Sequence, residues 1–558
     1  MNPTDASRGP APARLFFLAL LGVLLVYAGS ATHLIDLPGV YMDAVNPDYL
    51  VAKVLNRAHA DQLVAWVLPG NYLANRFPVL VSLYHGLQQF WLALPLYAIF
   101  GMSVDGIRLT HMVFAMGVLV AALLLLRRAQ VPLWIAALAG IALATDPTFV
   151  FAFRTQSYIT MSPVAWLLLS LAALSGAGER GAPLSIRHYF ASGVCFGFAV
   201  LGYFVYAFYL PAMLLWMLGM ARAQPTGAPT GPGLKDAAGW LAGLVVGCAY
   251  YVLGYSLVAR KVGGGLAGFV AYLGESSTRL SAFPTGLSFD DRVATATSFV
   301  ESVFTNDWQR ALMFGASEPQ PFDALRVLLL IVAPLVLFAY AESRGRSTPL
   351  MRMAIALPCS FFAVSLVFGN RLGGHHFMSF LPLAYVALAA GLAPMPSDAR
   401  GRHAAGAIVA AGFLCALAAI NLAATQRVFV TLARTGGVGL YSDAVNRLAA
   451  DVAALSPSTL VYFPDWGLAL PVTLITGGSV ATSAIVNATE AHRLLCGGRD
   501  VAIAIVGEDR TGRFASWAHD FQWQGPRVKT FLQRDGKAVA QLGVYASASR
   551  GESACRSG

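Results

Sequence analysis

Long apolar runs separated by short polar segments recur from residue 15 to about residue 422. A helix needs roughly 20 predominantly apolar residues to cross the hydrocarbon core of a bilayer. We expect about eleven transmembrane helices, at approximately residues 15–27, 107–126, 132–150, 162–174, 189–203, 205–220, 237–258, 325–340, 351–368, 377–392 and 404–422. The pattern therefore predicts a polytopic α-helical membrane protein.

Composition supports the same class. The 558 residues are 57% hydrophobic and only 12% charged, and the mean hydropathy is +0.62. A water-exposed globular surface needs a far larger charged fraction, so a soluble protein is excluded. The net charge of +10 gives no reason to expect a nucleic-acid partner, because excess Lys and Arg in a membrane protein mainly sets orientation.

The segment 79–100 is long enough to span, but it carries Tyr84-His85-Gly86 and Gln88-Gln89 near its middle. Polar side chains within a bilayer are costly unless they face a protein interior. If this segment lies on the outer face instead, the arginines of the later connecting loops all become cytoplasmic, as the positive-inside rule expects. These arginines are Arg127, Arg128, Arg180, Arg187, Arg222, Arg344, Arg346, Arg400 and Arg402. We adopt that topology.

This topology places the N-terminus in the cytoplasm and the C-terminus outside, in a bacterial-type inner membrane. Residues 1–424 form the membrane domain, with large external loops at 31–106 and 259–323. Residues 425–558 mix polar positions with short apolar runs, which predicts a small periplasmic α/β domain. Cys496 and Cys555 lie in that region and could form a disulfide if it is outside the cytoplasm. We find no heptad or small-xxx-small face that would indicate an oligomer.

Polar residues that could carry chemistry gather on the external side, in the first loop, residues 146–158, residues 260–322 and residues 371–376. A transporter needs such groups near the middle of the membrane, so that both sides have access. An enzyme that acts on a lipid-linked substrate needs them at one surface. The distribution favours an enzyme.

Asp43 and Asp48 are the candidate catalytic residues in the first loop, and Lys53 and Arg57 follow them. A carboxylate could accept the proton of an attacking hydroxyl, while the cations stabilise charge on a leaving phosphate. Two plainer interpretations remain: Asp43 as a solvated loop residue, and Asp48 as a first-turn residue after Pro47 that favours the positive end of a helix.

Further external residues are candidates for binding phosphate or acceptor. The candidate phosphate ligands are Arg154, Arg371, His375 and His376, and the candidate acceptor-side residues are Asp146 and His85. Each also has a structural interpretation: Arg154 could snorkel to the interface, Asp146 could end a helix, and the histidines could be packed interface residues. We assign no metal ligands.

The order of short motifs resembles the GT-C glycosyltransferases of the polyprenyl-phosphate-sugar type, such as protein O-mannosyltransferases and the aminoarabinose transferases of lipid A. In those enzymes a first span leads to an external loop with an Asp, then a surface segment ending in an aromatic-Gly pair, then an Arg-Leu pair that opens the next span. Here these motifs are Met42-Asp43-Ala44, Phe77-Pro78 through Tyr84-His85-Gly86 to Phe100-Gly101, and Arg108-Leu109. The resemblance covers approximately residues 15–422.

The resemblance implies that Asp43 deprotonates an acceptor hydroxyl or amine as it attacks the anomeric carbon of the donor sugar, with inversion and departure of polyprenyl phosphate. The acceptor would be a lipid, glycan or protein. Related enzymes often have a second acidic residue near Asp146, and a role for a divalent metal stays open. Ala44 stands where the family often has Glu, which leaves Asp48 as a candidate for part of the reaction.

Two other functions stay open. An O-antigen ligase or polymerase would use a polyprenyl-diphosphate donor and depend on external arginines and histidine rather than on Asp43. A lipid or solute transporter would keep its transport activity after Asp43→Asn.

Overall fold

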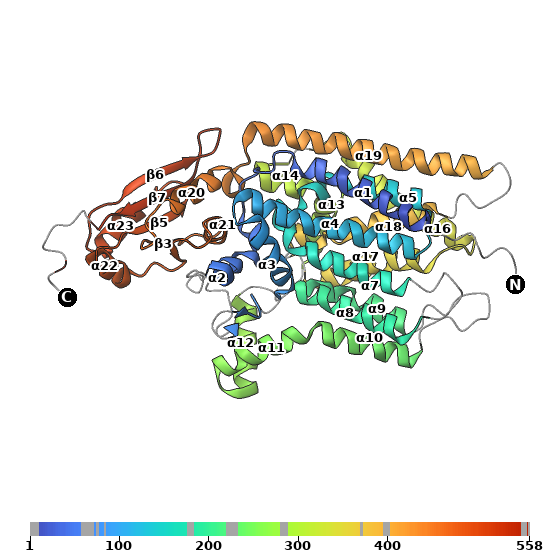
Figure 1. Cartoon of the computed structure of the whole chain (residues 1–558), viewed down its shortest axis with the longest axis horizontal. Coiled ribbons are helices and arrows are strands. Elements are labelled where there is room, and N and C mark those ends of the chain that lie inside the picture. Colours follow the sequence, from blue (N-terminus) through green and yellow to red (C-terminus); the bar gives the residue numbers. More distant parts are fainter. Residues whose placement is uncertain are drawn as a thin grey trace.

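The computed structural model describes residues 11–56, 72–73, 77–82, 85–175, 184–218, 233–279, 288–317, 319–368, 372–393, 402–547 and 555. A bundle of helices occupies one end of the long axis, and a sheet with its own helices occupies the other (Figure 1). Helix α1 (Ala11–Thr32) lies in the bundle, and strand β7 (Ala538–Tyr545) lies in the sheet region.

The helices of the bundle follow the expected apolar runs. They are α1 (Ala11–Thr32), α4 (Val104–Arg128), α5 (Leu133–Ala144), α7 (Met161–Leu174), α8 (Ile186–Gly202), α9 (Leu210–Met217), α10 (Leu234–Gly247), α11 (Ala249–Val262), α16 (Ala333–Ser343), α17 (Pro349–Phe368), α18 (Phe380–Leu392) and α19 (Arg402–Thr435). By length and composition, seven helical segments among the described residues could cross a membrane, or eight if the bent pair α10 and α11 counts as one span. The chain is an integral membrane protein, but the expected count of eleven spans is not confirmed.

The shortfall comes from shorter helices. The expected span 132–150 is divided, because α5 ends at Ala144 and α6 (Pro147–Ala152) begins after the N-cap residue Asp146. The expected span 205–220 begins with the 3-10 helix η7 (Phe204–Tyr209) and continues as the eight-residue α9. The hydropathy of the sequence is continuous across these breaks, so the apolar pattern does not show where one helix ends and the next begins.

The segment 79–100 contains α3 (Gln88–Phe100), which ends at Gly101 with a φ of 78°. Its 13 residues extend only about 20 Å, which is too short to cross a hydrocarbon core of about 30 Å. Before α3, residues 80 and 86 form an isolated antiparallel bridge, and strands β1 (Tyr72–Leu73) and β2 (Phe77–Pro78) pair. This arrangement is compatible with a surface segment.

The remaining elements connect the helices of the bundle. They are η2 (Met42–Val45), η3 (Asp48–Leu50), α2 (Val51–Asn56), η5 (Gln156–Thr160), α12 (Gly265–Arg279), α13 (Phe289–Val303), α14 (Asp307–Phe314), α15 (Asp323–Val327), the π-helix η9 (Leu328–Val332) and η11 (Gly374–Phe377). The described part of the expected loop 259–323 is thus largely helical. Ser288 and Asp291 form a capping box that begins α13.

Glycines allow α8 and α10 to approach closely. A Cβ at Gly193 would lie 2.0 Å from the Trp240 carbonyl oxygen, and one at Gly243 would lie 2.2 Å from the Phe190 carbonyl oxygen. Gly193 and Gly197, and Gly243 and Gly247, are spaced by four residues. These small-xxx-small repeats pack two helices of one chain together, so they do not bear on the expectation that no such face indicates an oligomer.

A five-stranded sheet forms the core of the C-terminal region, in the order β4-β3-β5-β7-β6. Strand β3 (Leu460–Tyr462) pairs in parallel with β4 (Ala481–Ser483) and β5 (Val501–Val506), whereas β7 (Ala538–Tyr545) pairs antiparallel with β5 and β6 (Arg527–Leu532). The helices α20 (Ala444–Ala453) and α21 (Ala469–Ile475) pack on one core, and α22 (Ala488–Cys496) and α23 (Arg513–Asp520) pack on the other. The small α/β fold expected here is confirmed.

Two details refine this region. Helix α19 continues to Thr435, and the short η13 (Gly439–Tyr441) follows it, so the expected boundary after residue 424 falls inside a helix. Cys496 and Cys555 form a disulfide that joins the end of α22 to the C-terminal tail.

Candidate functional site

Asp43 lies on η2, in the loop that connects α1 to α2, and its side chain is partly exposed. The C-terminal region holds this loop in place. The Gly39 N–H donates to the Tyr441 carbonyl oxygen at 2.7 Å, and the Val40 N–H donates to the Asn446 side chain at 3.2 Å. Asp43 therefore lies where the first loop meets the C-terminal region.

The surroundings of Asp43 make it a stronger base than an ordinary carboxylate. Burial raises the pKa of Asp43 from 3.8 to about 6, and a hydrogen bond from the Gln156 amide partly offsets that increase. Removal of water disfavours the charged form of a carboxylate, whereas an N–H donor favours it. A base with a pKa near the working pH is well suited to accept a proton during a reaction.

Aromatic side chains surround this carboxylate. Tyr41 stacks on Tyr441 with ring centroids 4.6 Å apart, and the Trp466 side chain hydrogen-bonds to Tyr41. Trp466 is 51% exposed, although it is a large apolar residue. Sequence reasoning did not identify Gln156 or Tyr441, because these residues come together only through contacts between distant parts of the chain.

Asp48 occupies a different environment. It is fully buried, and its Oδ2 accepts hydrogen bonds from the Tyr97 hydroxyl at 2.8 Å and the Tyr158 hydroxyl at 2.7 Å. The Nε2 of His111 lies 3.4 Å from the same oxygen. A substrate could not reach this carboxylate without opening the core. Asp48 therefore anchors the first loop to α3, α4 and η5, and its expected part in catalysis stays a prediction.

Arg154 is also part of the scaffold. Its guanidinium is buried and donates to the backbone carbonyl oxygens of Ala31, His33, Leu34 and Leu37 at the end of α1. Arg108 holds the same loop by donating to the Pro38 carbonyl oxygen at 2.9 Å. The carbonyl oxygens of the loop accept from both terminal nitrogens of Arg154, whereas its Nε has no hydrogen-bond partner among the described residues, and its expected phosphate-binding role stays a prediction.

Asp146 likewise has its partners within the protein. One carboxylate oxygen caps α6 by accepting from the Thr148 N–H at 2.8 Å, and the other accepts from Arg326 and from the Tyr385 hydroxyl, both at 2.8 Å. Asp146 is completely buried. The helix-end interpretation fits this geometry, and we do not propose a contact with acceptor or metal.

His85, His375 and His376 gather around Tyr203. The His376 Nε2 lies 3.0 Å from the Tyr203 hydroxyl, and the His375 and His376 rings are 3.9 Å apart. His85 packs edge-on against Tyr203 at 5.3 Å, and burial lowers the pKa of His85 to about 4. His375 and His376 are partly exposed, and the His375 Nδ1 has no hydrogen-bond partner among the described residues. We call these four residues the histidine cluster.

The other expected cations cannot be placed. Arg57 and Arg371 lie outside the described residues, and the side chain of Lys53 on α2 also lies outside the description. Where the chain is described, no group of three or more His, Cys, Asp or Glu residues is arranged to hold a metal ion.

The 3-10 helix η5 connects the two parts of the site. It packs against η2, which carries Asp43, and against η11, which carries His375 and His376. Its first residue, Gln156, is the hydrogen-bond partner of Asp43. A carboxylate and a set of imidazoles are therefore presented on neighbouring elements.

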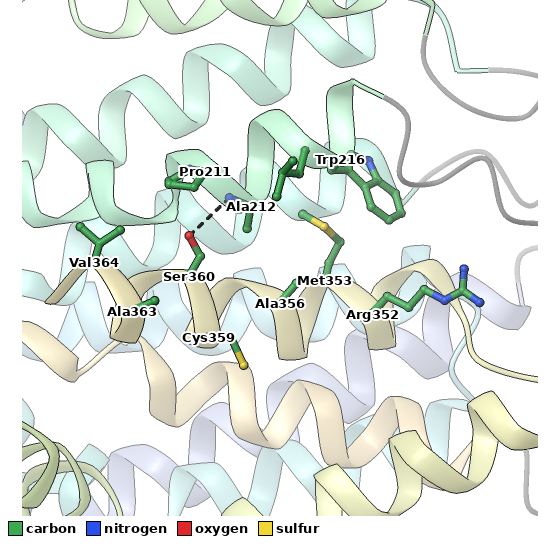
Figure 2. Close-up of a pocket in the computed structure, with 11 residues that line it drawn as sticks. Pro211, Ala212, Trp216, Arg352, Met353, Ala356, Cys359, Ser360, Ala363 and Val364 are labelled. Carbon is green, nitrogen blue, oxygen red and sulfur yellow. Dashed lines mark hydrogen bonds between the residues drawn. The ribbon is translucent and has the colours of Figure 1, made fainter. Parts of the chain in front are cut away.

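An apolar groove of about 470 Å³ lies between α9 and α17 (Figure 2). Arg352 is the one charged residue in its lining, and it pairs with Glu342 at 2.7 Å. Ser360 tethers the two helices by accepting from the Ala212 N–H and donating to the Phe208 carbonyl oxygen. Along the chain, α9 follows Tyr203 through η7, and α17 precedes η11, which carries His375 and His376. Its dimensions and apolar lining suit a hydrocarbon chain.

Comparison with known proteins identifies the fold. No protein-family model and no curated protein matches the chain. The crystal structure of ArnT from Cupriavidus metallidurans bound to undecaprenyl phosphate is similar over 96% of this chain and 98% of that one, with a TM-score of 0.54 and 14% identity. The archaeal oligosaccharyltransferase AglB from Archaeoglobus fulgidus, in complex with an inhibitory peptide and a dolichol-phosphate, has a TM-score of 0.41 and 12% identity, over 92% of this chain and 72% of that one. The chain has the ArnT-like membrane fold that the resemblance to GT-C glycosyltransferases led us to expect.

Proposed function

We propose that this protein is an inverting glycosyltransferase that moves a sugar from a polyprenyl-phosphate donor to a lipid, glycan or protein acceptor at the external face of the membrane. The observation that carries the proposal is Asp43, a partly exposed carboxylate whose pKa is raised by burial to about 6, close to the Tyr41 and Tyr441 side chains. It lies in a chain with the fold of ArnT, whose structure contains undecaprenyl phosphate.

In the proposed reaction, the Asp43 carboxylate accepts the proton of the acceptor hydroxyl or amine. The acceptor atom forms a bond to the anomeric carbon as the bond from that carbon to the phosphate oxygen breaks. The electron pair leaves with polyprenyl phosphate, and attack from the opposite side inverts the configuration. Because phosphate is already a good leaving group, one carboxylate can serve, in contrast to the two carboxylates of most glycoside hydrolases.

The histidine cluster is the candidate site for the donor phosphate. Imidazole N–H and phenol O–H groups are donors that phosphate oxygens accept. A phosphate bound there would also favour protonation of the imidazoles, because an anion stabilises the charged form. Lys53, Arg57 and Arg371 stay candidates for additional charge. The prenyl chain would extend from the phosphate along the groove between α9 and α17.

Two observations support action at the external face. The cysteines of the C-terminal region form a disulfide, and disulfides persist mainly outside the cytoplasm. Arg127 and Arg128 end α4 at the side of the bundle away from the C-terminal region, where the positive-inside rule expects the cytoplasm. The N-terminus would then be cytoplasmic, and the C-terminal region would be periplasmic in a bacterial-type inner membrane.

The proposal can be tested with membranes that contain the full-length protein and with matched membranes that lack it. Each is incubated with polyprenyl-phosphate sugars carrying a pentose, a hexose or an amino sugar, and release of polyprenyl phosphate is measured by mass spectrometry. We expect protein-dependent release from at least one donor. The same assay with polyprenyl-diphosphate sugars tests the ligase interpretation, and release from those donors alone would contradict the proposal. Absence of release from every donor would contradict it in favour of a transporter.

A further inference from the structure

The loop that follows β3 presents Trp466 in a fixed position. Asp465 and Arg513 form two parallel hydrogen bonds, of 2.9 and 3.0 Å, and Asp465 also accepts from the Val506 N–H at 2.9 Å. Gly467 follows with a φ of 108°, a conformation that side-chain-bearing residues rarely adopt. The loop is therefore tied to β5 and α23 on one side of Trp466 and turns sharply on the other.

Trp466 extends from this loop to the first loop of the membrane region. Its indole N–H donates to the Tyr41 hydroxyl, and Tyr41 in turn stacks on Tyr441. Half of the Trp466 surface is exposed. Single exposed apolar residues are common, so exposure alone indicates little. An anchored tryptophan beside a carboxylate of raised pKa is a more specific arrangement.

One polar atom next to these rings lacks a hydrogen-bond partner. Gln156 hydrogen-bonds to both Asp43 and Tyr41 through its amide group. Its Oε1 atom is buried and has no hydrogen-bond partner among the described residues. A buried acceptor of this kind is costly unless a partner arrives. A ligand hydroxyl would satisfy it.

We propose that Trp466, Tyr41, Tyr441 and Gln156 form a sugar-binding subsite beside Asp43, to which the C-terminal region contributes the stacking tryptophan. The apolar C–H face of a sugar ring would lie on the Trp466 indole, and a ring hydroxyl would donate to the Gln156 Oε1. Aromatic rings bury large apolar areas with few torsions to order, which suits a rigid ring with one apolar face. This inference rests on the proposed function, and it makes the C-terminal region a part of the binding site.

The ring in this subsite could belong to the acceptor or to the donor sugar, because both would present the same chemistry. An acceptor ring would bind together with the donor and would direct its hydroxyl to Asp43. A donor ring would instead compete with any free sugar for the same surface. The experiment below separates these sources.

Binding is measured by saturation-transfer NMR with the full-length protein in lipid nanodiscs and a panel of methyl pyranosides and furanosides as probes. We expect ring C–H signals from at least one methyl glycoside, an affinity about five- to tenfold weaker in Trp466→Ala, and a smaller loss in Trp466→Phe. Trp523→Ala is the matched control, because Trp523 lies in the same sheet region and its indole N–H donates to the Ala546 carbonyl oxygen. Thermal unfolding of each variant verifies that the sheet region is folded.

Addition of a polyprenyl-phosphate sugar identifies the source. If the glycoside signals persist, the subsite binds the acceptor. If the signals are lost, and sugar-free polyprenyl phosphate does not abolish them, the subsite binds the donor sugar. Both results support the subsite. No binding by the wild type, or equal binding by Trp466→Ala and the wild type, would overturn it. Because this readout needs no turnover, Trp466-dependent binding without sugar transfer would reject the proposed function and keep the subsite.

Discussion

The basicity of Asp43 comes from where its carboxylate lies. Burial against the aromatic residues of the two loops removes water and raises the pKa to about 6, while the Gln156 amide favours the ionised form. At neutral pH such a group is mostly ionised, yet it holds a proton more firmly than a solvated aspartate does. Both properties are required of a general base.

The transfer rate should therefore follow the ionisation of Asp43. Activity is expected to decrease about tenfold per pH unit below a pH of about 6 and to level off above about 7, because only the ionised form accepts a proton. Gln156→Met removes the hydrogen bond that favours the charged form, so the midpoint should move to higher pH. Profiles of kcat/KM against pH for both proteins measure this, and a midpoint that stays in place or decreases in Gln156→Met would contradict the assignment.

The same raised pKa predicts an effect on stability. Because the pKa of Asp43 is higher in the folded protein than in the unfolded chain, ionisation of Asp43 lowers the stability of the fold. This loss of stability is absent below a pH of about 4 and reaches its full size above a pH of about 6. Asp43→Asn cannot ionise and should be more stable than the wild type at pH 8, by at most about 3 kcal/mol, with the difference disappearing towards pH 4. Thermal unfolding in detergent across this range measures it. A variant less stable than the wild type at pH 8 would show that the carboxylate has a structural role.

The sequence shows which charged residues lie in the expected external loops, but it does not show what those residues do. The sequence placed Asp43 in the first loop, and the resemblance assigned it to catalysis. The sequence also placed Arg154 and Asp146 at the external boundary, but their partners lie far away in the chain. Arg154 donates to carbonyl oxygens of residues 31–37, and Asp146 pairs with Arg326, 180 positions later. No local pattern reveals that such charges are already satisfied.

Among the helices, the close contact of α8 with α10 depends on glycines. In a membrane, apolar side chains gain little by leaving lipid, so close backbone approach is a main source of helix association. The spacing of Gly193 and Gly197, and of Gly243 and Gly247, is visible in the sequence, but the spacing alone does not show whether such residues pack within one chain or between chains. By contrast, the long spans followed directly from their hydropathy.

Gly243→Ala should therefore destabilise the bundle. The added Cβ would lie 2.2 Å from the Phe190 carbonyl oxygen and 2.9 Å from the Val194 nitrogen, so the helices must separate. We expect a loss of about 1–3 kcal/mol, observed as a lower unfolding temperature. Gly117→Ala on α4 is the control, because nothing lies within 4 Å of its added Cβ. Equal unfolding temperatures for the two variants would contradict the role of Gly243 in packing.

The whole molecule joins a membrane bundle to a sheet region at the first loop (Figure 1). The Asn56 side chain donates to the Gly477 carbonyl oxygen at 3.0 Å, and the Asn446 side chain donates to the Asp36 carbonyl oxygen at 3.1 Å. The change of composition near residue 425 predicted a separate α/β unit. It did not predict docking beside Asp43, because that docking depends on pairs of residues about 400 positions apart.

The proposed orientation predicts which residues an external reagent reaches. In a variant whose four unpaired cysteines are replaced by alanine, Ser516→Cys on α23 should react with a membrane-impermeant maleimide on intact spheroplasts. Ser343→Cys at the end of α16 should react only after permeabilisation. Both positions are exposed, so access depends on the side of the membrane. The opposite labelling pattern would reverse the topology.

The central claim is that Asp43 is the base in transfer of a sugar from polyprenyl phosphate. The most direct measurement compares transfer by the wild type, Asp43→Asn and Asp36→Asn with whichever donor is active. Asp36 is an exposed carboxylate of the same loop and serves as the matched control. We predict that Asp43→Asn lowers the transfer rate by a factor of about 10² or more, although its unfolding temperature at pH 8 is at least that of the wild type. Asp36→Asn should transfer sugar at close to the wild-type rate. Undiminished transfer by folded Asp43→Asn would contradict the account.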